Sequence, residues 1–436
     1  MIERVSPDDL MMLACDVGPV PLQVGAVLVL DGGPGFDIAA AQAVLAERIA
    51  AIPRLRQRIA RVPIGCGRPV WVDDPAFDIA AHLHSVPCPA PGDEAALLEL
   101  AATVATRPLP WSAPPWSATF VGGLTGSRTA MIVVFHHVLA DGIGGLAVLA
   151  SLVDGAPSHQ PWPAARRAPS LSELALDAIR SRRRAIARAF ASPAVVPGRL
   201  RPAIAELNVA AAVPARRTTL TGPAGRNRRI TVTRTDLRRV KDVAHANGAT
   251  VNDVVLTAVT RSLHAFLARR GERLDDVVVS VIVSGRAATA PDQLGNRVGT
   301  MPVRLPACGD WGDQLAEVAA ITKAHKTDHR GASAALLAPA FRTLAALGVV
   351  RWFLNRQWFV QVFVTNLRGP AERLSFAGAA VTDIYPITLI AGNVTLSFGV
   401  MSYAGTLMVV IMADPDRHRD LDALTDLLQR ELDGLR

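Results

Sequence analysis

The sequence is poor in lysine, cysteine and aromatic residues, and each scarcity excludes a class of protein. Three of its 46 basic residues are lysines, and the many arginines are scattered without interleaved aromatic side chains. That pattern excludes a nucleic-acid platform, which needs a basic patch with stacking rings. The four cysteines are widely spaced and form no Cys-x-x-Cys pair, so we expect reduced thiols in a cytoplasmic protein.

Further absences concern membranes, export and covalent catalysis. The apolar runs fall short of the roughly 18 to 20 residues that span a bilayer, so any membrane contact is expected to be peripheral. Residues 1–13 contain Glu3, Asp8 and Asp9 and lack a basic stretch followed by an apolar one, so we expect no secretory leader. The sequence has no Gly-x-Ser-x-Gly segment, so no acyl-enzyme on a serine is expected.

The length of 436 residues suits two domains, and half of the residues are hydrophobic. Strand-like runs that alternate with helical periods predict a layered α/β fold. In the first half we expect strands at 22–30, 116–121 and 129–135 and helices at 36–51, 95–106 and 143–153. In the second half we expect strands at 229–233, 277–283, 360–365, 379–384, 395–403 and 407–412, and helices at 236–246, 250–269, 311–325, 332–349 and 421–435.

Composition divides the chain into an N-terminal domain at 1–154, a crossover linker at 155–215 and a C-terminal domain at 216–436. The linker is rich in proline, alanine and arginine. Within it, residues 171–190 are compatible with a basic helix that carries Arg180, Arg182, Arg183, Arg184 and Arg188. This helix either bridges the domains in solvent or contacts anionic lipid head groups.

The strongest chemical signal is the pair His136 and His137, which ends an apolar run and precedes Asp141. Histidine titrates near neutral pH, so it can take a proton from a hydroxyl or thiol and return it. Consecutive strand residues point to opposite faces, so one ring can enter a channel while the other faces the core. The alternative is that the two histidines have a structural role and that Asp141 caps the next helix. No His-x-x-x-His spacing includes either residue, which argues against zinc.

Three other motifs also have a local structural interpretation. Gly142, Gly144 and Gly145 are not followed by Lys-Ser or Lys-Thr, so they predict a tight strand-to-helix turn rather than a phosphate loop. Thr250 and Asp253 have the spacing of a capping box. His82 and His84 share one face of a possible strand, where packing or surface roles are expected in preference to zinc binding.

Several blocks occur in an order that resembles the wax ester synthase/diacylglycerol acyltransferase family. This family belongs to the larger group of acyltransferases related to chloramphenicol acetyltransferase and condensation domains. The blocks cover nearly the whole chain and lie at 3–10, 24–31, 53–58, 77–83, 136–142, 248–256, 294–298, 365–370 and 402–405. They include Pro-Arg-Leu-Arg-Gln-Arg at 53–58, Thr-Val-Asn-Asp at 250–253 and Thr-Asn-Leu-Arg-Gly-Pro at 365–370.

One segment departs from the family pattern. The family usually carries Asp-Arg-x-Arg-Pro-Leu-Trp before the strand that leads to the histidine pair. Here the segment is Leu-Pro-Trp-Ser-Ala-Pro-Pro-Trp at 109–116, without charged residues and with Pro115 in place of leucine. The departure leaves the acyl and acceptor preference open and does not affect the histidines.

The resemblance implies two chloramphenicol-acetyltransferase-like domains, each a mixed sheet flanked by helices, with an active-site tunnel at their interface. It implies transfer of a long acyl chain from acyl-CoA to diacylglycerol or a fatty alcohol. The donor is a substrate, and no resident cofactor or metal is expected. The protein would act in the cytoplasm, or peripherally on the inner membrane or lipid droplets.

The resemblance also assigns site residues. His137 would be the general base, with His136 and Asp141 completing the catalytic motif. Asp141 would act as a scaffold paired with an arginine, for which Arg56 is the first candidate and Arg54 and Arg286 are alternatives. Four residues are assigned to substrate binding: Gly142, Asn252, Asp253 and Trp116.

Two other hypotheses stay open. In the first, the fold is kept but the donor is an acyl carrier protein, or the acceptor is a polyketide or sugar hydroxyl. In the second, the protein binds acyl-CoA or lipid without catalysing transfer. The intact histidine pair argues against this second hypothesis.

Overall fold

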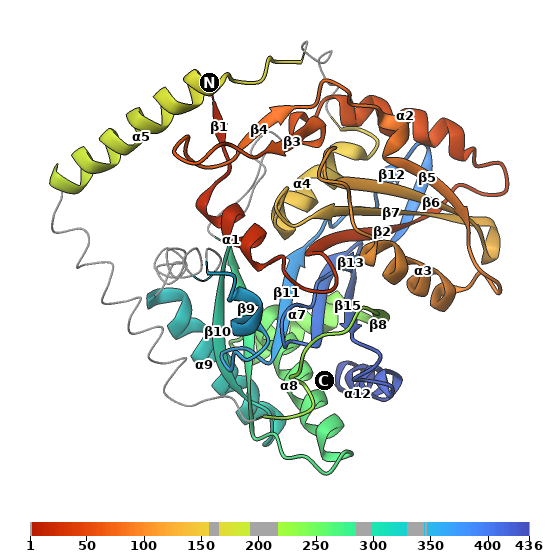
Figure 1. Ribbon diagram of the computed structural model, residues 1–436. Coiled ribbons are helices and arrows are strands. Elements are labelled where there is room, and N and C mark those ends of the chain that lie inside the picture. The colour runs from red at the N-terminus through yellow and green to blue at the C-terminus, as the bar shows by residue number, and fades with distance from the viewer. Residues whose placement is uncertain are drawn as a thin grey trace.

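The computed structural model describes residues 2–156, 165–191, 217–284, 298–328, 344 and 347–435. Two six-stranded sheets with their helices form two lobes, which lie one above the other in Figure 1. Each sheet contains both parallel and antiparallel neighbours. The expected α/β class with two mixed sheets is therefore confirmed.

The first sheet has the strand order β12-β13-β2-β7-β6-β5. Its strands are β2 (Gln23–Asp31), β5 (Leu83–Pro87), β6 (Trp116–Leu124), β7 (Arg128–His136), β12 (Ser375–Phe376) and β13 (Ala379–Ile387). The helices of this lobe are α2 (Ile38–Ala50), α3 (Glu94–Thr106) and α4 (Gly142–Leu152). Side chains of β2 alternate between two cores: Leu28 and Leu30 share one with α2, whereas Val27 and Val29 share the other with α3. Both faces of the sheet are therefore buried.

A small sheet extends the first lobe. It has the order β1-β4-β3 and consists of β1 (Glu3–Arg4), β3 (Gln57–Ala60) and β4 (Val70–Asp73). Helix α1 (Pro7–Cys15) follows β1, and the short 3-10 helix η1 (Pro53–Arg56) leads into β3. Two further 3-10 helices belong to the first sheet's connections: η2 (Ile79–Ala81) precedes β5, and η3 (Thr125–Ser127) joins β6 to β7. The linker helix α5 (Leu171–Ala191) packs its first turns against this sheet.

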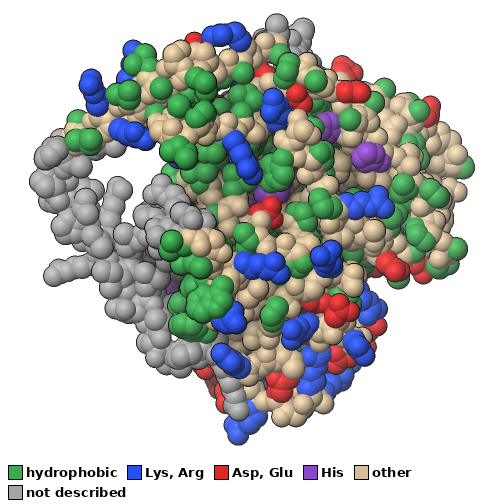
Figure 2. Space-filling view, viewed as in Figure 1, with side chains coloured by type: hydrophobic (Ala, Val, Ile, Leu, Met, Phe, Trp, Pro, Cys, Tyr) green, Lys and Arg blue, Asp and Glu red, His purple; other side chains and the backbone are tan. Residues whose placement is uncertain are grey.

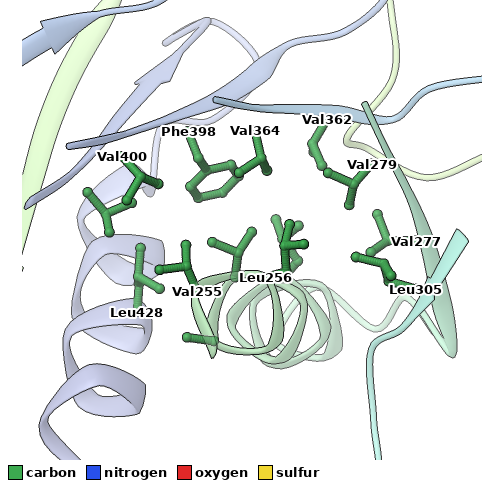
Figure 3. Packing of buried hydrophobic residues seen from close by; sticks show 14 of the residues in the cluster. Val255, Leu256, Val277, Val279, Leu305, Val362, Val364, Phe398, Val400 and Leu428 are labelled. Atoms are coloured by element: carbon green, nitrogen blue, oxygen red, sulfur yellow. The ribbon is translucent and has the colours of Figure 1, made fainter. Parts of the chain in front are cut away.

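The second sheet has the order β10-β9-β11-β14-β15-β8. Its strands are β8 (Arg229–Asp236), β9 (Asp276–Ser284), β10 (Val298–Pro306), β11 (Val362–Arg368), β14 (Leu396–Tyr403) and β15 (Thr406–Ala413). The helices are α7 (Leu237–Ala246), α8 (Val251–Ala268), α9 (Trp311–Asp328), α11 (Val350–Leu354) and α12 (Leu421–Asp433). Figure 3 shows valine, leucine and phenylalanine side chains of the sheet packed onto α8 and α12, which explains the uninterrupted apolar runs of these strands.

The second half of the chain contributes two strands to the sheet of the first lobe. Strand β13 lies late in the chain, yet it pairs antiparallel with β2 of the first sheet, with Tyr385 opposite Val27. Strand β12 extends the same edge. The expected boundary at 216–436 therefore encloses two strands that belong to the first sheet, an arrangement that no local pattern indicated.

Most expected elements are present. Strands β2, β6, β7, β8, β9, β11, β13, β14 and β15 and helices α2, α3, α4, α5, α7, α8, α9 and α12 overlap the predicted ranges. The predictions omitted β10 and the small sheet. The expected helix at 332–349 lies largely outside the described residues, and the proline-rich stretch at 193–214 lies wholly outside them. Among the helices that the structure describes, none is both long and apolar enough to cross a membrane.

Candidate active site

The histidine pair lies where β7 ends. His136 is the last residue of β7 and lies opposite Gln23 of β2. The backbone N–H of His137 donates to the carbonyl of Leu22 at 2.8 Å, which carries the strand pairing one residue further. The His136 side chain is buried, whereas His137 keeps partial exposure. One histidine of the pair is thus buried and the other is partly exposed, and the role of each stays a prediction.

His136 is held from both ring nitrogens. Its Nδ1 accepts the backbone N–H of Val138 at 3.1 Å, so its Nε2 carries the proton and donates to Oδ2 of Asp16, also at 3.1 Å. The ring of Trp111 lies 4.7 Å from the His136 ring, tilted by 59°. These contacts fix the turn that follows and make His136 a positioning residue.

Asp16 and Trp111 were not assigned roles from the sequence. Asp16 is 120 residues from His136, and its other carboxylate oxygen accepts the N–H of Leu22 at 2.9 Å. A lone aspartate after a helix carries no signal for such a partner. Trp111 lies in the segment that departs from the family pattern, and it is 44% exposed beside the buried His136. Part of the Trp111 surface is therefore open to solvent.

Asp141 caps α4. Its buried Oδ1 accepts the backbone N–H of Gly144 at 2.8 Å, and its carbonyl accepts the N–H of Gly145. The capping alternative is thus confirmed, with the carboxylate at the positive end of a helix. Asp141 keeps the turn between His137 and α4 in shape, which is a scaffold role.

The pairing of Asp141 with Arg56 stays a prediction. The guanidinium carbon of Arg56 lies 5.2 Å from the centroid of the Phe77 ring, and the Asp73 carboxylate counteracts the lowering of the Arg56 pKa by burial. Arg54 pairs with Glu3 and lies over Trp71. Both arginines lie in or beside the small sheet, because η1 ends where β3 begins. The remaining candidate, Arg286, lies outside the described residues.

Gly142 marks the contact between the lobes. A Cβ added to it would lie 2.9 Å from Cδ2 of Leu367 on β11, so a larger residue would have to displace the Leu367 side chain. Next to Leu367, the side-chain amide of Asn366 donates to Oδ1 of Asn252 at 3.2 Å. Asn252 lies in the first turn of α8 and is partly exposed. The two halves of the chain thus bring these motifs together at one interface.

Asp253 does not face a substrate. It is buried, and its carboxylate accepts the backbone N–H and the hydroxyl of Thr250 at 2.8 and 2.7 Å and the hydroxyl of Thr322 at 2.7 Å. The capping box predicted from the spacing is therefore confirmed. The substrate-binding assignment of Asp253 is corrected to a structural one.

Trp116 is also a core residue. Its indole N–H donates to the carbonyl of Leu55 at 2.7 Å, and its ring stacks on His82 with centroids 4.5 Å apart. It is 2% exposed, so it offers no surface to a substrate. Burial lowers the pKa of His82, which agrees with the expected packing role of that histidine.

The thiol of Cys15, next to Asp16 in the sequence, is not activated. Burial and the neighbouring Asp16 carboxylate raise the pKa of Cys15 to about 11, so the thiol stays protonated near neutral pH. Only the thiolate is an effective nucleophile. Cys15 is therefore unsuited to forming an acyl-enzyme, in line with the missing serine elbow.

Comparison with known proteins agrees with the geometry. The model of the wax ester synthase/diacylglycerol acyltransferase catalytic domain matches residues 5–255, and that of the WS/DGAT C-terminal domain matches 294–436. The chain belongs to the wax ester synthase/diacylglycerol acyltransferase family. It is an acyltransferase of this family.

Relatives in this family span most of the chain. A probable diacylglycerol O-acyltransferase of Mycobacterium tuberculosis is 33% identical over 418 residues, covering 91% of this chain and 87% of the relative. The wax ester synthase/diacylglycerol acyltransferase of Marinobacter aquaeolei has the same fold, with a TM-score of 0.70, 21% identity and coverage of 99% and 98% of the two chains. A starter condensation domain of rhizomide synthetase, solved with C8-CoA, superposes with a TM-score of 0.64 at 17% identity over 99% and 93%. The expected fold relationship is confirmed.

Proposed function

We propose that this protein transfers a long-chain acyl group from acyl-CoA to the hydroxyl of diacylglycerol or a fatty alcohol, with His137 as the general base. The acceptor oxygen bonds to the thioester carbonyl carbon while His137 takes its proton. The carbon–sulfur bond then breaks, and His137 returns the proton to the CoA thiolate. Coenzyme A and an ester are the products, and no covalent enzyme intermediate or resident cofactor is required.

One observation carries this proposal. Of the two adjacent histidines, His136 is fixed through both nitrogens, whereas His137 keeps partial exposure at the end of the same strand. A general base must reach its substrate, so the partly exposed histidine is the one suited to the role. The contact between Gly142 and Leu367 puts this strand end beside the second lobe.

The chemistry of the surroundings supports the donor and the acceptor. The names of the relatives supply diacylglycerol as a candidate acceptor, and the rhizomide neighbour shows that this fold can hold an acyl-CoA. Around the histidines, Trp111, Leu146 and Leu367 offer apolar surface, which suits an acyl chain better than a polar substrate. The tunnel expected from the resemblance stays a prediction, because residues 285–297 and 329–343 lie outside the described part of the chain.

The first prediction tests the base. We expect His137→Ala to lower the turnover of long-chain acyl-CoA with diacylglycerol or a long-chain alcohol by about 10² to 10⁴, the usual contribution of general-base catalysis. The measurement is release of free CoA thiol with a colorimetric reagent, together with chromatographic detection of the ester. His84→Ala is the matched control, because His84 is an exposed histidine on β5, in the first lobe.

An unchanged rate in His137→Ala with a folded protein would remove His137 from the reaction. Ester formation from an acyl carrier protein, or on a polyketide or sugar hydroxyl but not on lipid acceptors, would instead favour the hypothesis of another donor or acceptor. The departure at 109–116 motivates that screen, because it places Trp111 against His136. Tight acyl-CoA binding without CoA release on any acceptor would indicate a non-catalytic binding protein.

A further inference from the structure

Helix α5 is attached to the molecule by its first two turns. Leu174 and Ala178 are buried, and Leu174 shares a small apolar cluster with Val70 and Val72 of β4. The guanidinium of Arg4 donates to the carbonyl of Leu174 at 2.9 Å and pairs with Asp177 at 2.9 Å. From residue 179 to 187, every side chain that the structure describes is exposed. The last turns of α5 extend away from the body of the first lobe (Figure 1).

Helix α5 presents apolar side chains to solvent from its second turn onward. Leu176, Ile179 and Ile186 are 48%, 46% and 57% exposed. At 100° per residue, these three positions fall within an arc of about 80° on the helix. Most of the stability of a protein helix comes from packing of its apolar face, and nothing in the described structure covers this face. Its apolar stripe therefore lacks the burial that normally stabilises an amphipathic helix.

The same turns are strongly basic. Between Ala178 and Ala191 the sequence has five arginines and no acidic residue. The four whose side chains are described, Arg180, Arg182, Arg183 and Arg184, are all exposed, and none forms an ion pair within the described part of the chain. Figure 2 shows basic and apolar side chains interspersed over the upper-left limb, where Figure 1 places α5.

We propose that α5 docks the protein onto the surface of an anionic lipid bilayer. The apolar side chains enter the boundary between head groups and acyl chains. The arginines contact lipid phosphates: Arg180, Arg182 and Arg184 lie beside the apolar arc, and Arg183, which falls within it, extends its guanidinium to the head groups. Positive charge that is neither paired nor interrupted by acids complements such a surface. This proposal goes beyond the acyl transfer reaction, because it concerns where the protein binds rather than what it catalyses.

The composition distinguishes docking from a solvated bridge. A helix that spans solvent is polar on all sides or carries acid–base pairs at i and i+4. Beyond Asp177, α5 has neither property. Of the two roles compatible with the sequence, the observed exposure of Ile179 and Ile186 favours the lipid surface.

The experiment is flotation of the full chain with vesicles of phosphatidylcholine alone or mixed with phosphatidylglycerol. We expect the protein to float with the mixed vesicles and to stay in solution with phosphatidylcholine alone. Two variants, R182Q/R183Q/R184Q and I179Q/I186Q, should each reduce binding at least about tenfold. Glutamine keeps a good helix propensity, so the helix itself is not removed.

Matched controls separate α5 from the general basicity of a chain with a net charge of +8. R61Q/R226Q/R269Q removes the same charge from three exposed arginines elsewhere, and I64Q removes an exposed isoleucine from a loop. Both controls should bind like the parent protein. Equal losses in the two arginine triples, or full binding by both α5 variants, would overturn the proposal.

Self-association is the competing outcome. Gel filtration without vesicles should give the same elution volume for the parent protein and I179Q/I186Q. A larger species that only the parent forms would make α5 an interface between copies of this chain and would overturn lipid docking. Since flotation does not depend on turnover, its failure leaves the proposed reaction untouched, and loss of turnover in His137→Ala leaves lipid docking untouched.

Discussion

At the scale of single residues, the geometry of the site depends on a contact between distant parts of the chain. Asp16 accepts two hydrogen bonds, one from Nε2 of His136 and one from the backbone N–H of Leu22. Leu22 in turn accepts the backbone N–H of His137. The carboxylate therefore ties together the strand end, the buried ring and the backbone of the proposed base.

Replacing Asp16 tests this positioning role. An asparagine has one acceptor oxygen where aspartate has two, so in Asp16→Asn either His136 or Leu22 loses its partner. We expect the free energy of unfolding to fall by about 1–3 kcal/mol and kcat to fall with little change in KM, because the turn that carries His137 loosens. Denaturant unfolding and steady-state kinetics measure the two effects. Asp242→Asn, an exposed aspartate on α7, is the control and should change neither quantity.

A raised KM with unchanged kcat would contradict the positioning role, since it would mean that Asp16 contributes to substrate affinity. If Asp16→Asn does not fold, Trp111→Phe is the variant to measure in its place. This substitution keeps an aromatic ring beside His136 and should change acceptor preference more than stability, because Trp111 is partly exposed.

At the scale of elements, helix ends determine how the motifs are presented. Asp141 caps α4 and Asp253 closes a capping box with Thr250 at the start of α8. In each case, the residue next to the capping carboxylate along the chain meets β11: Gly142 touches Leu367 across the lobe interface, and Asn252 accepts a hydrogen bond from Asn366 within the second lobe. The aspartates of these motifs thus act through the helices that they begin.

The assignment of Asp253 leads to a stability prediction. Asp253→Ala should lower the free energy of unfolding by about 1–3 kcal/mol, because the Thr250 amide and two hydroxyls lose a buried acceptor. Turnover per folded molecule should change little in comparison. Asp37→Ala removes the exposed cap of α2 and should cost less, about 0.5–1 kcal/mol. Loss of turnover without loss of stability in Asp253→Ala would return Asp253 to the substrate site.

At the scale of the whole molecule, strand β13 couples the two lobes, because it comes from the second half of the chain and pairs with β2 of the first sheet. The chain has two tyrosines, and both bond to or from β13. The Tyr385 hydroxyl lies between Glu94 of α3 and Arg234 of β8, and the Tyr403 hydroxyl donates to Val381. The core around α3 also includes side chains of β8 and β15 from the second lobe.

This coupling predicts cooperative unfolding. We expect one denaturant transition for both lobes, followed by intrinsic fluorescence and by circular dichroism. Tyr403→Phe should cost about 1–3 kcal/mol, because the amide of Leu374 and the carbonyl of Val381 lose a buried partner. Tyr385→Phe should cost about 1 kcal/mol, since Arg234 and Glu94 still pair. Two separate transitions in the parent protein would show that the lobes unfold independently.

The sequence determined what local chemistry can determine. Apolar periodicity located most strands and helices, and the spacing of Thr250 and Asp253 gave the cap. The adjacency of His136 and His137 at a strand end already assigned opposite faces to the two rings. Each of these features depends on neighbours within a few positions along the chain. Because the motifs can be recognised locally, their order along the chain was sufficient to indicate the family.

Only the tertiary structure decided which distant residues meet. Asp16 contacts His136, Trp116 is buried while Trp111 is partly exposed, and β13 joins the sheet of the other lobe. Such contacts depend on strand order and lobe packing, which many sequences satisfy with different residues. Local pattern carries no record of a partner that lies more than a hundred residues away.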